Sequence, residues 1–323
     1  MPGAPMSRGR LLDWSLLVFC NLVWASQFVM VKLVQRQLGP IAATLLPMAL
    51  ATALLVPFVL RERKQRAPGP RPGAGASALS VVGQFVLLGV LGQVFAQLFI
   101  TWGMRYASAS NAALLMLMLP VITAVMARVL LGEHMTPVRW VSFGLAIVGA
   151  LLCSGIDWSA VSLAGNQAAL GSGLVVLSIC GSAFYNVYSK RLLASYSPLE
   201  VLLYSYFAVL ACLAPIAWTL EPATFTRLPH LTATTLAGIG VLAFFQYCIS
   251  MVAFLAVLKR LDANQASLGN YLIPFFGLLI AAALLGERLQ GPVIVGGALV
   301  LSATVLATLG ERKSRAGELA VPT

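Results

Sequence analysis

The chain has 323 residues, of which 59% are hydrophobic and only 10% are charged, with a formal net charge of +11. Soluble globular domains carry about 25% charged residues, so this composition excludes an ordinary water-soluble protein. The basic residues lie in short segments between apolar runs rather than in one patch, which argues against a nucleic-acid-binding protein.

Ten segments of 17 or more residues contain no Asp, Glu, Lys or Arg. A membrane-spanning helix needs about 20 mostly apolar residues, and the alternating pattern of a membrane β-barrel is absent. We therefore predict an all-α polytopic membrane protein with ten transmembrane helices. The expected helices cover residues 14–34, 40–60, 79–104, 108–131, 137–154, 170–192, 199–219, 234–258, 263–285 and 291–309.

The second half of the chain repeats the first. Leu119-Pro120 and Leu131-Gly132-Glu133 return as Ile273-Pro274 and Leu285-Gly286-Glu287, both at a shift of 154 residues. Three earlier residues return at a shift of 158: Lys32, Pro40 and Pro57 match Lys190, Pro198 and Pro215. We predict two five-helix repeats, at residues 14–154 and 170–310, followed by a cytoplasmic tail at 311–323.

Five membrane crossings are an odd number, so the two repeats are expected to cross the bilayer in opposite directions. Inverted repeats are a common plan of secondary transporters, in which the substrate site lies between the halves near the midplane. The duplication therefore favours a transporter that works by alternating access.

The basic residues also predict an orientation. With ten spans and the N-terminus inside, 16 of the 21 Lys and Arg residues fall on one side of the membrane. The positive-inside rule then places both termini in the cytoplasm. We expect an integral protein of the bacterial inner membrane.

The sequence resembles the EamA-type, ten-helix members of the drug/metabolite transporter superfamily. The tandem repeat and its two Leu/Ile-Pro…Leu-Gly-Glu patterns carry the resemblance, together with Asn-Leu-Val-Trp-Ala at residues 21–25, and it extends from about residue 14 to 310. It implies a central cavity lined mainly by the first, third, fourth, sixth, eighth and ninth helices. It also implies export of amino acids, other metabolites or toxic compounds, without deciding among them.

Polar side chains inside the membrane mostly face the bundle interior or a cavity. The wider set of such residues includes Gln27, Tyr188 and Gln265, and each member either lines the cavity or joins two helices by a hydrogen bond. The aromatic members either form an amphipathic wall for an organic substrate or serve packing. The predicted substrate-binding residues are Asn21, Trp24, Gln93, Gln97, Asn111, Tyr185, Asn186, Gln246, Tyr247, Asn270 and Tyr271.

A second set is expected to act in gating or in structure: Lys32, Lys190, Pro120, Pro274, Glu133 and Glu287. The two prolines should kink their helices, either as hinges or as static bends. The two lysines either extend to the membrane interface or form a pair of cations that gate the cavity. The two glutamates end helices at the dipole's negative end, which suggests basic partners such as Arg139 and Arg288.

All ten carboxylates lie in expected loops or at helix ends, so no mid-membrane acid is available to relay protons or to pair with a lipophilic cation. We therefore predict a small neutral or zwitterionic organic substrate, such as an amino acid or a related metabolite, and export as the direction. The alternative is a multidrug exporter of lipophilic cations.

A membrane-embedded enzyme is not expected, because the chain lacks metal-ligand spacings, a phosphate-binding loop and enough titratable groups for acid–base chemistry. We predict no cofactor and no metal site. The expected partners are a small-molecule substrate and membrane lipids, with no nucleic acid. The oligomeric state is not indicated by the sequence.

Overall fold

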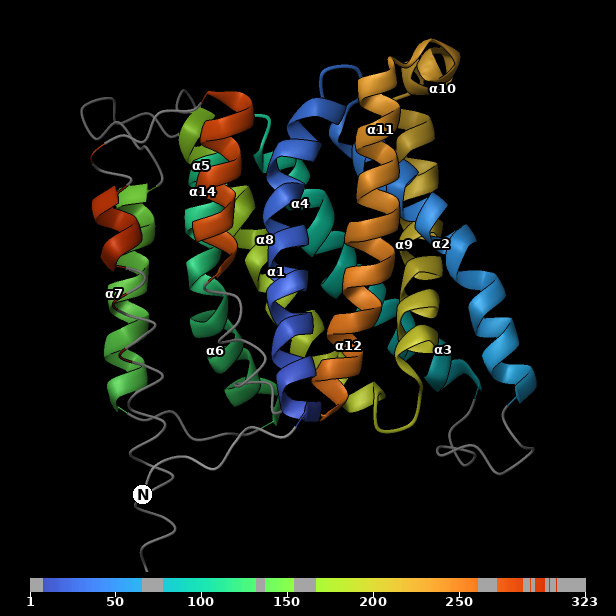
Figure 1. Ribbon diagram of the computed structural model, residues 1–323, viewed down its shortest axis with the longest axis horizontal. Helices are drawn as coiled ribbons and strands as arrows, with labels where there is room; N and C mark the ends of the chain where they lie inside the picture. The colour runs from blue at the N-terminus through green and yellow to red at the C-terminus, as the bar shows by residue number, and fades with distance from the viewer. Residues whose placement is uncertain are drawn as a thin grey trace, which may run out of the picture.

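The computed structural model (Figure 1) describes residues 8–65, 78–131, 137–153, 167–260, 272–286 and 294–299, together with 291, 302 and 306. All regular structure in these residues is helical. In chain order the elements are α1 (Arg8–Val34), α2 (Pro40–Gln65), α3 (Ala78–Leu87), η1 (Leu88–Val94), α4 (Phe95–Gly103), α5 (Ala109–Leu115), η2 (Met116–Met118), α6 (Leu119–Leu131), α7 (Pro137–Cys153), α8 (Gln167–Leu192), α9 (Pro198–Leu220), α10 (Ala223–Arg227), η3 (Leu228–His230), α11 (Ala233–Val241), η4 (Leu242–Ser250), α12 (Met251–Arg260) and α14 (Leu272–Leu285).

Seven helical stretches in the described residues are long and apolar enough to cross a membrane: Ser15–Val34, Pro40–Gln65, Leu79–Gly103, Ala109–Leu130, Gln167–Leu192, Pro198–Leu220 and Ala233–Arg260. The helix α7 has 17 residues and α14 has 14. The all-helical membrane architecture agrees with the sequence prediction. The count of ten remains a prediction, because residues 263–271 and much of 291–309 lie outside the described residues.

Two predicted boundaries are wrong by a turn or more. The first helix begins at Arg8, not at residue 14, and α2 continues through Pro57 to Gln65, not to residue 60. A proline removes one hydrogen bond, but in lipid a continuous helix still satisfies the other backbone groups, so it does not end the helix. The short helices α10 and η3 were not predicted.

Two of the long helices are each interrupted by a π-helical segment, η1 between α3 and α4 and η4 between α11 and α12. Leu88 and Leu242, which begin these segments, are 154 residues apart, the same shift that relates Pro120 to Pro274. A π-helical turn takes an extra residue and is frequent at functional sites. The interruptions therefore fall at matching places in the two halves of the chain.

The interruption expected at Pro120 is present. Three residues of 3₁₀ helix, Met116–Met118, separate α5 from α6, whose second residue is this proline. Pro274 is the third residue of α14, where its missing N–H has no partner within the helix in any case. A kink ahead of Pro274 would lie outside the described residues.

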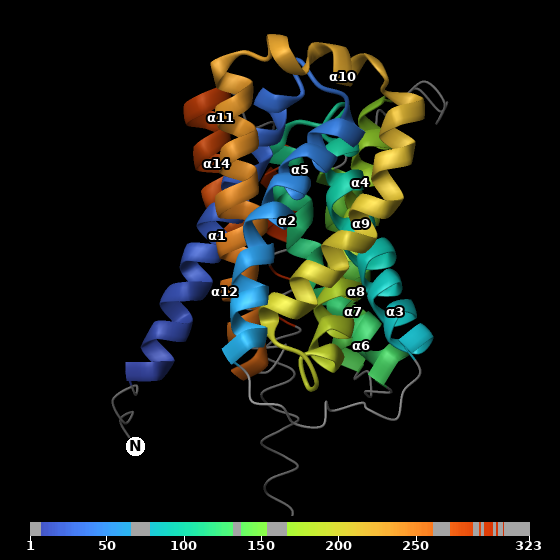
Figure 2. The same ribbon diagram turned by 90° about the vertical axis from the view of Figure 1, so that its right-hand side faces the viewer.

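The helices α2 and α9, which hold matching places in the two halves, run antiparallel (Figure 2). Arg63 near the end of α2 contacts Glu200 near the start of α9, with 3.1 Å between Nε and Oε1. At the other end of this pair, Glu221 follows α9 and contacts the first turn of α2. The end of α1 and the start of α8 likewise meet at one place, the connection 104–107 after α4. This arrangement supports the prediction of inverted repeats.

Glycines allow α4 and α8 to approach closely. A Cβ atom added to Gly103 would lie 2.7 Å from the Gly171 carbonyl oxygen, and one added to Gly181 would lie 2.6 Å from the Ala96 nitrogen. Small residues are the usual means of close helix packing in lipid, where the hydrophobic effect does not drive helices together. This contact joins the two halves of the chain beside the cavity described next.

Candidate functional site

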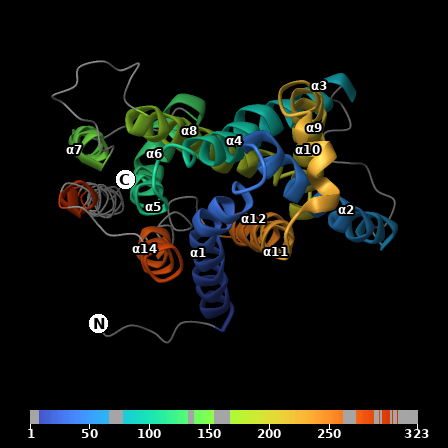
Figure 3. The same cartoon turned by 90° about the horizontal axis from the view of Figure 1, so that it is seen from above.

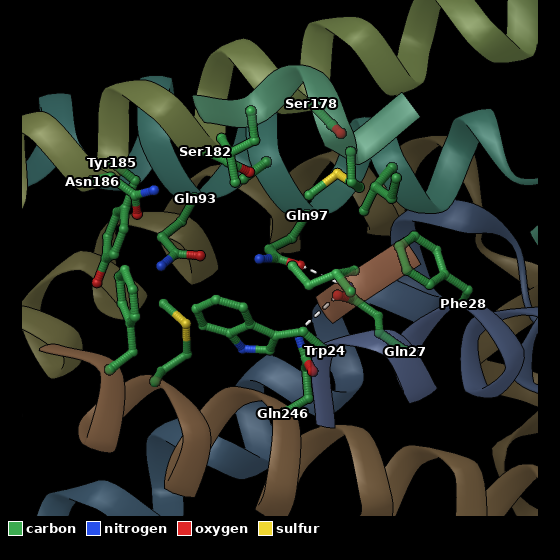
Figure 4. A pocket seen from close by; sticks show the side chains of 17 residues that line it. Trp24, Gln27, Phe28, Gln93, Gln97, Ser178, Ser182, Tyr185, Asn186 and Gln246 are labelled. Carbon is green, nitrogen blue, oxygen red and sulfur yellow. Dashed lines mark hydrogen bonds between the residues drawn. The ribbon is translucent and has the colours of Figure 1, made fainter. Parts of the chain in front are cut away.

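A cavity of about 70 Å³ lies between helices of both halves (Figure 4). Its side chains come from α1, η1, α4, α8, η4 and α12, with one residue each from η2, α6 and α14. The described lining contains no charged residue. It consists of Trp24, Gln27, Phe28, Gln93, Ala96, Gln97, Ile100, Met116, Leu119, Ser178, Ser182, Tyr185, Asn186, Gln246, Met251, Phe254 and Ile273.

Three glutamines from three helices form a hydrogen-bonded chain across the cavity (Figure 4). Gln246 Nε2 donates to Gln27 Oε1 at 2.8 Å, and Gln27 Nε2 donates to Gln97 Oε1 at 2.8 Å. The hydroxyl of Tyr247 also donates to Gln97 Oε1, at 3.3 Å. The chain links α1 and α4 of the first half to η4 of the second.

This chain has a direction, because every amide donates the same way along it. It ends in an acceptor, Gln246 Oε1, and in a donor, Gln97 Nε2, which bonds to no other described residue. Gln246 Oε1 and Gln93 Oε1 are buried and have no hydrogen-bond partner in the described residues. A buried acceptor without a partner costs about 1–3 kcal/mol, so both oxygens are poised to accept a donor from a bound molecule.

Aromatic rings form another part of the wall. The indole of Trp24 donates from Nε1 to Ser250 Oγ at 3.0 Å and packs edge-on against Phe254, with 4.9 Å between ring centroids. The hydrogen bond and the ring contact hold the indole in one orientation in the lining. The wall is therefore amphipathic, with amides and aromatic rings side by side.

Six of the predicted substrate-binding residues line the cavity: Trp24, Gln93, Gln97, Tyr185, Asn186 and Gln246. Tyr247 is fully buried behind them, where it contacts Gln27 and Gln97. Asn270 and Tyr271 lie outside the described residues.

Two other predicted residues do not line this cavity. Asn21 is fully buried and donates from Nδ2 to the Leu17 carbonyl within its own helix, at 2.6 Å. Asn111 lies in the first turn of α5 and donates to Ser172 Oγ of α8 at 3.2 Å. The alternative stated for single polar residues, a hydrogen bond between helices, describes Asn111 well.

Other lining residues carried weaker sequence signals. Gln27 belonged to the wider polar set, and Ser178 and Ser182 share one helical stripe with Tyr185. The apolar members gave no signal, because an apolar residue that lines a cavity has the same spacing as one that packs in the core. These are Phe28, Ala96, Ile100, Met116, Leu119, Met251, Phe254 and Ile273.

The family follows from comparison with known proteins. The model of the EamA-like transporter family matches the chain twice, over residues 14–155 and 169–309. The chain belongs to the EamA-like transporter family. It is thus an integral membrane protein of a transporter family rather than a membrane-embedded enzyme. The family resemblance indicated by the repeated Pro…Leu-Gly-Glu pattern is confirmed.

Relatives of this EamA-like transporter include proteins named for export. A "Probable terminal-alkyne amino-acid exporter" of Streptantibioticus cattleyicolor is 27% identical over 92% of this chain and 94% of its own. A "Probable amino-acid metabolite efflux pump" of Salmonella typhimurium is 24% identical over 94% of this chain and 97% of its own. A solved crystal structure with 16% identity, covering 95% of this chain and 99% of the other, superposes with a TM-score of 0.64 and so shares the fold.

The residues expected to act in gating have different positions in this EamA-like transporter. Lys32 Nζ donates to the Ala107 carbonyl oxygen at 2.7 Å, so it fastens α1 to the connection after α4. Lys190 lies in the last turn of α8, and Pro120 follows the 3₁₀ segment beside the cavity. Glu133 and Glu287, with their suggested partner Arg288, lie outside the described residues, and nothing is described of the Arg139 side chain.

Proposed function

We propose that this EamA-like transporter exports small neutral or zwitterionic organic molecules, such as amino acids, by alternating access through the cavity between inverted repeats. It resides in the bacterial inner membrane with both termini in the cytoplasm. The names of the two amino-acid and metabolite exporters among its relatives support this substrate class and this direction.

The directional chain of glutamines carries the proposal. Its acceptor end, Gln246 Oε1, suits an ammonium group, and its donor end, Gln97 Nε2, suits a carboxylate. The described lining offers no full charge to either group. The ammonium and the carboxylate of the substrate are therefore bound by amide dipoles, one at each end of the glutamine chain. An ion with a single charged group would form a hydrogen bond with only one end of the glutamine chain.

Alternating access needs a barrier on one side of the cavity. Two hydrogen bonds supply it at the end of the bundle where α10 lies: Lys32 Nζ to the Ala107 carbonyl, and Gln35 Nε2 to the Thr101 carbonyl. Both join α1 to α4 or to the connection after it. Opening toward that side therefore requires these two bonds to break, while the antiparallel twin helices provide the matching movement at the other side.

The multidrug alternative draws support from the aromatic wall, since Trp24 and Phe254 offer ring faces to a cation. Two observations weigh against it. The described lining has no carboxylate to neutralise a cation. The cavity of about 70 Å³ is also small beside the roughly 300–1,000 Å³ of pockets that hold drug-sized ligands.

Counterflow in proteoliposomes tests the proposal. Vesicles containing the purified full-length protein are loaded with an unlabelled amino acid and diluted into a solution of the same amino acid in labelled form. Each of the twenty amino acids is tried in turn, and a lipophilic phosphonium cation is the comparison. We expect at least one amino acid to accumulate and the phosphonium not to do so. Accumulation of the phosphonium alone would reject the zwitterion in favour of the multidrug alternative.

A further inference from the structure

A second hollow, of about 290 Å³, lies at the end of the bundle that carries α10. Figure 3 looks onto this end, where the connections after α1, α4 and α9 come together. We call it the arginine hollow, because Arg36, Arg105 and Arg227 reach it from these three connections. Its lining consists of Gln35, Arg36, Gln37, Leu38, Gly39, Arg105, Glu221, Ala223, Thr224 and Arg227.

The charges of this hollow are not balanced within the described chain. None of the three guanidinium groups forms an ion pair with a described carboxylate. The one acidic side chain in the lining, Glu221, accepts hydrogen bonds from the backbone N–H groups of Ile41 at 3.0 Å and Ala42 at 2.9 Å. Three arginines and one glutamate leave a formal charge of +2, and like charges held together this way are stabilised by an anion.

Membrane topology does not account for these arginines. In the proposed orientation this end faces outward, and the positive-inside rule favours basic residues at the other end. The sequence assigns only five basic residues to the outer side, Lys32, Arg36, Arg105, Arg227 and Arg288. Three of the five nevertheless lie around one hollow.

The arginine hollow lies in line with the central cavity. Along α1 and the turn after it, the cavity residues Gln27 and Phe28 are followed eight residues later by Gln35 and Arg36 of the hollow, about 12 Å at 1.5 Å per residue. On α4 the cavity residue Gln97 is followed in the same way by Arg105. The hydrogen bonds of Lys32 and Gln35 lie between the two spaces. The hollow is thus the space that a molecule enters when those bonds open.

We propose that the arginine hollow is a binding site for an oxyanion, a carboxylate or a phosphate, at the outer mouth of the transport path. Guanidinium groups bind such anions through paired N–H donors. If the bound anion is the carboxylate of a transported molecule, the proposal rests on the proposed function. The other possible anion is the phosphate group of a lipid. The site would bind the carboxylate of a zwitterion as it leaves the glutamine chain.

Anion binding to the intact protein tests the site. The purified full-length protein in nanodiscs of neutral phosphatidylcholine is titrated with succinate and with inorganic phosphate, and the melting temperature and binding isotherm are recorded against chloride of equal ionic strength. We expect both oxyanions to raise the melting temperature, since a ligand stabilises the state that binds it. Arg105→Gln/Arg227→Gln should weaken binding about tenfold or more, because it removes two guanidinium groups that donate charge-assisted hydrogen bonds to the anion.

The matched control is Arg61→Gln/Lys64→Gln, which removes two exposed positive charges from the other end of the bundle. It should bind both anions like the natural protein. Arg227→Gln alone, in the exposed helix α10, serves if the double variant unfolds. An anion response that is equal in the natural protein and in both arginine variants would overturn the proposal, because it would reflect general screening.

Two further arms separate the possible sources and the two proposals. If phosphatidylglycerol in the nanodisc removes the response to free anion, in the natural protein and in the Arg61→Gln/Lys64→Gln control alike, the site holds a lipid phosphate. Counterflow of an amino acid without anion binding would reject the site and leave the transport function standing. Anion binding without counterflow of any amino acid would leave the site standing and reject the transport function.

Discussion

Single residues decide what the central cavity recognises. Gln27 is the middle member of the glutamine chain: it accepts from Gln246 and donates to Gln97. No other described side chain joins those two amides. Replacing it therefore disconnects the acceptor end of the chain from the donor end, without introducing a charge into the lipid.

The variant Gln27→Met tests this role, because methionine has a similar volume and cannot form these hydrogen bonds. Gln246 Nε2 would lose its partner, at a cost of about 1–3 kcal/mol for a buried group, and Gln97 Oε1 would keep only the Tyr247 hydroxyl as a donor. We expect a lower melting temperature and counterflow reduced about tenfold, the change that corresponds to about 1.4 kcal/mol in a barrier.

Gln65→Met, at the exposed end of α2, is the matched control and should behave like the natural protein. Unchanged counterflow and melting temperature in Gln27→Met would show that the glutamine chain has no part in transport or stability.

At the scale of residues, the sequence predicted the polar lining better than the apolar lining. Buried amides in lipid are rare enough to be noticed one by one, and Gln93, Gln97 and Gln246 were found in this way. Asn21 has the same chemistry but bonds to its own helix. Which way a helix is turned about its axis depends on the packing of its neighbours, and the spacing of one residue type does not determine it.

At the scale of elements, α2 and α9 form an antiparallel pair fastened at both ends. Glu221 accepts hydrogen bonds from the first turn of α2, where the helix dipole favours a negative charge. At the other end, Ser197 and Glu200 form a capping box on α9, and Glu62 of α2 accepts from Ser197 Oγ at 3.0 Å. Each half of the chain thus supplies a carboxylate to the start of a helix in the other half.

A double-mutant cycle tests the fastening by Glu221. A Cβ atom added to Gly39 would overlap the Glu221 carboxylate, so Gly39→Ala should displace that carboxylate and destabilise the protein. Glu221→Ala should cost about 1–2 kcal/mol, as for the loss of other helix caps. We expect Gly39→Ala to cost much less when Glu221 is already alanine, with a coupling of about 0.5–3 kcal/mol between neighbours.

Melting temperatures of the two single variants and the double variant measure this coupling. Gly83→Ala is the control partner, because nothing lies within 4 Å of the added Cβ atom, and its effect should add to that of Glu221→Ala. Equal costs of Gly39→Ala in both backgrounds would exclude the contact.

The elements themselves were predicted well where composition alone determines them. Long apolar runs gave α8 and α9 nearly to their ends, and Pro120 predicted the irregular turn beside the cavity. The segments η1 and η4 could not be predicted, since a π-helical turn has no distinct pattern of polar and apolar residues. In η1 the backbone lies close to α9, since a Cβ atom added to Gly89 would lie 2.6 Å from the Ser205 carbonyl oxygen.

At the scale of the whole molecule, the duplication predicts that α1 and α8, like α2 and α9, run in opposite directions. An odd number of spans per half requires inversion, and that requirement holds without any knowledge of side-chain contacts. The closing bonds of Lys32 and Gln35 could not be foreseen, because both are made to backbone carbonyls. A carbonyl acceptor is present at every residue, so the sequence does not indicate which one is used.

Labelling of single cysteines from each side of the membrane tests the orientation. Lys64 and Thr226 are exposed at opposite ends of the bundle. A membrane-impermeant maleimide added to intact cells should label Thr226→Cys, and should label Lys64→Cys only after the cells are permeabilised. The natural protein measures the background from its own cysteines, of which Cys20 and Cys248 are buried and Cys180 and Cys212 are half-buried.

The same experiment with Glu133→Cys and Glu287→Cys tests the inversion itself, because these residues hold equivalent positions in the two repeats. Inverted repeats require the cysteines at 133 and 287 to face opposite sides, and the proposed orientation places 133 in the cytoplasm and 287 outside. The opposite assignment for both pairs would reverse the orientation and keep the inversion. Labelling of both 133 and 287 from one side would mean that the two repeats cross the membrane in the same direction. Alternating access based on two inverted repeats would then have no structural basis.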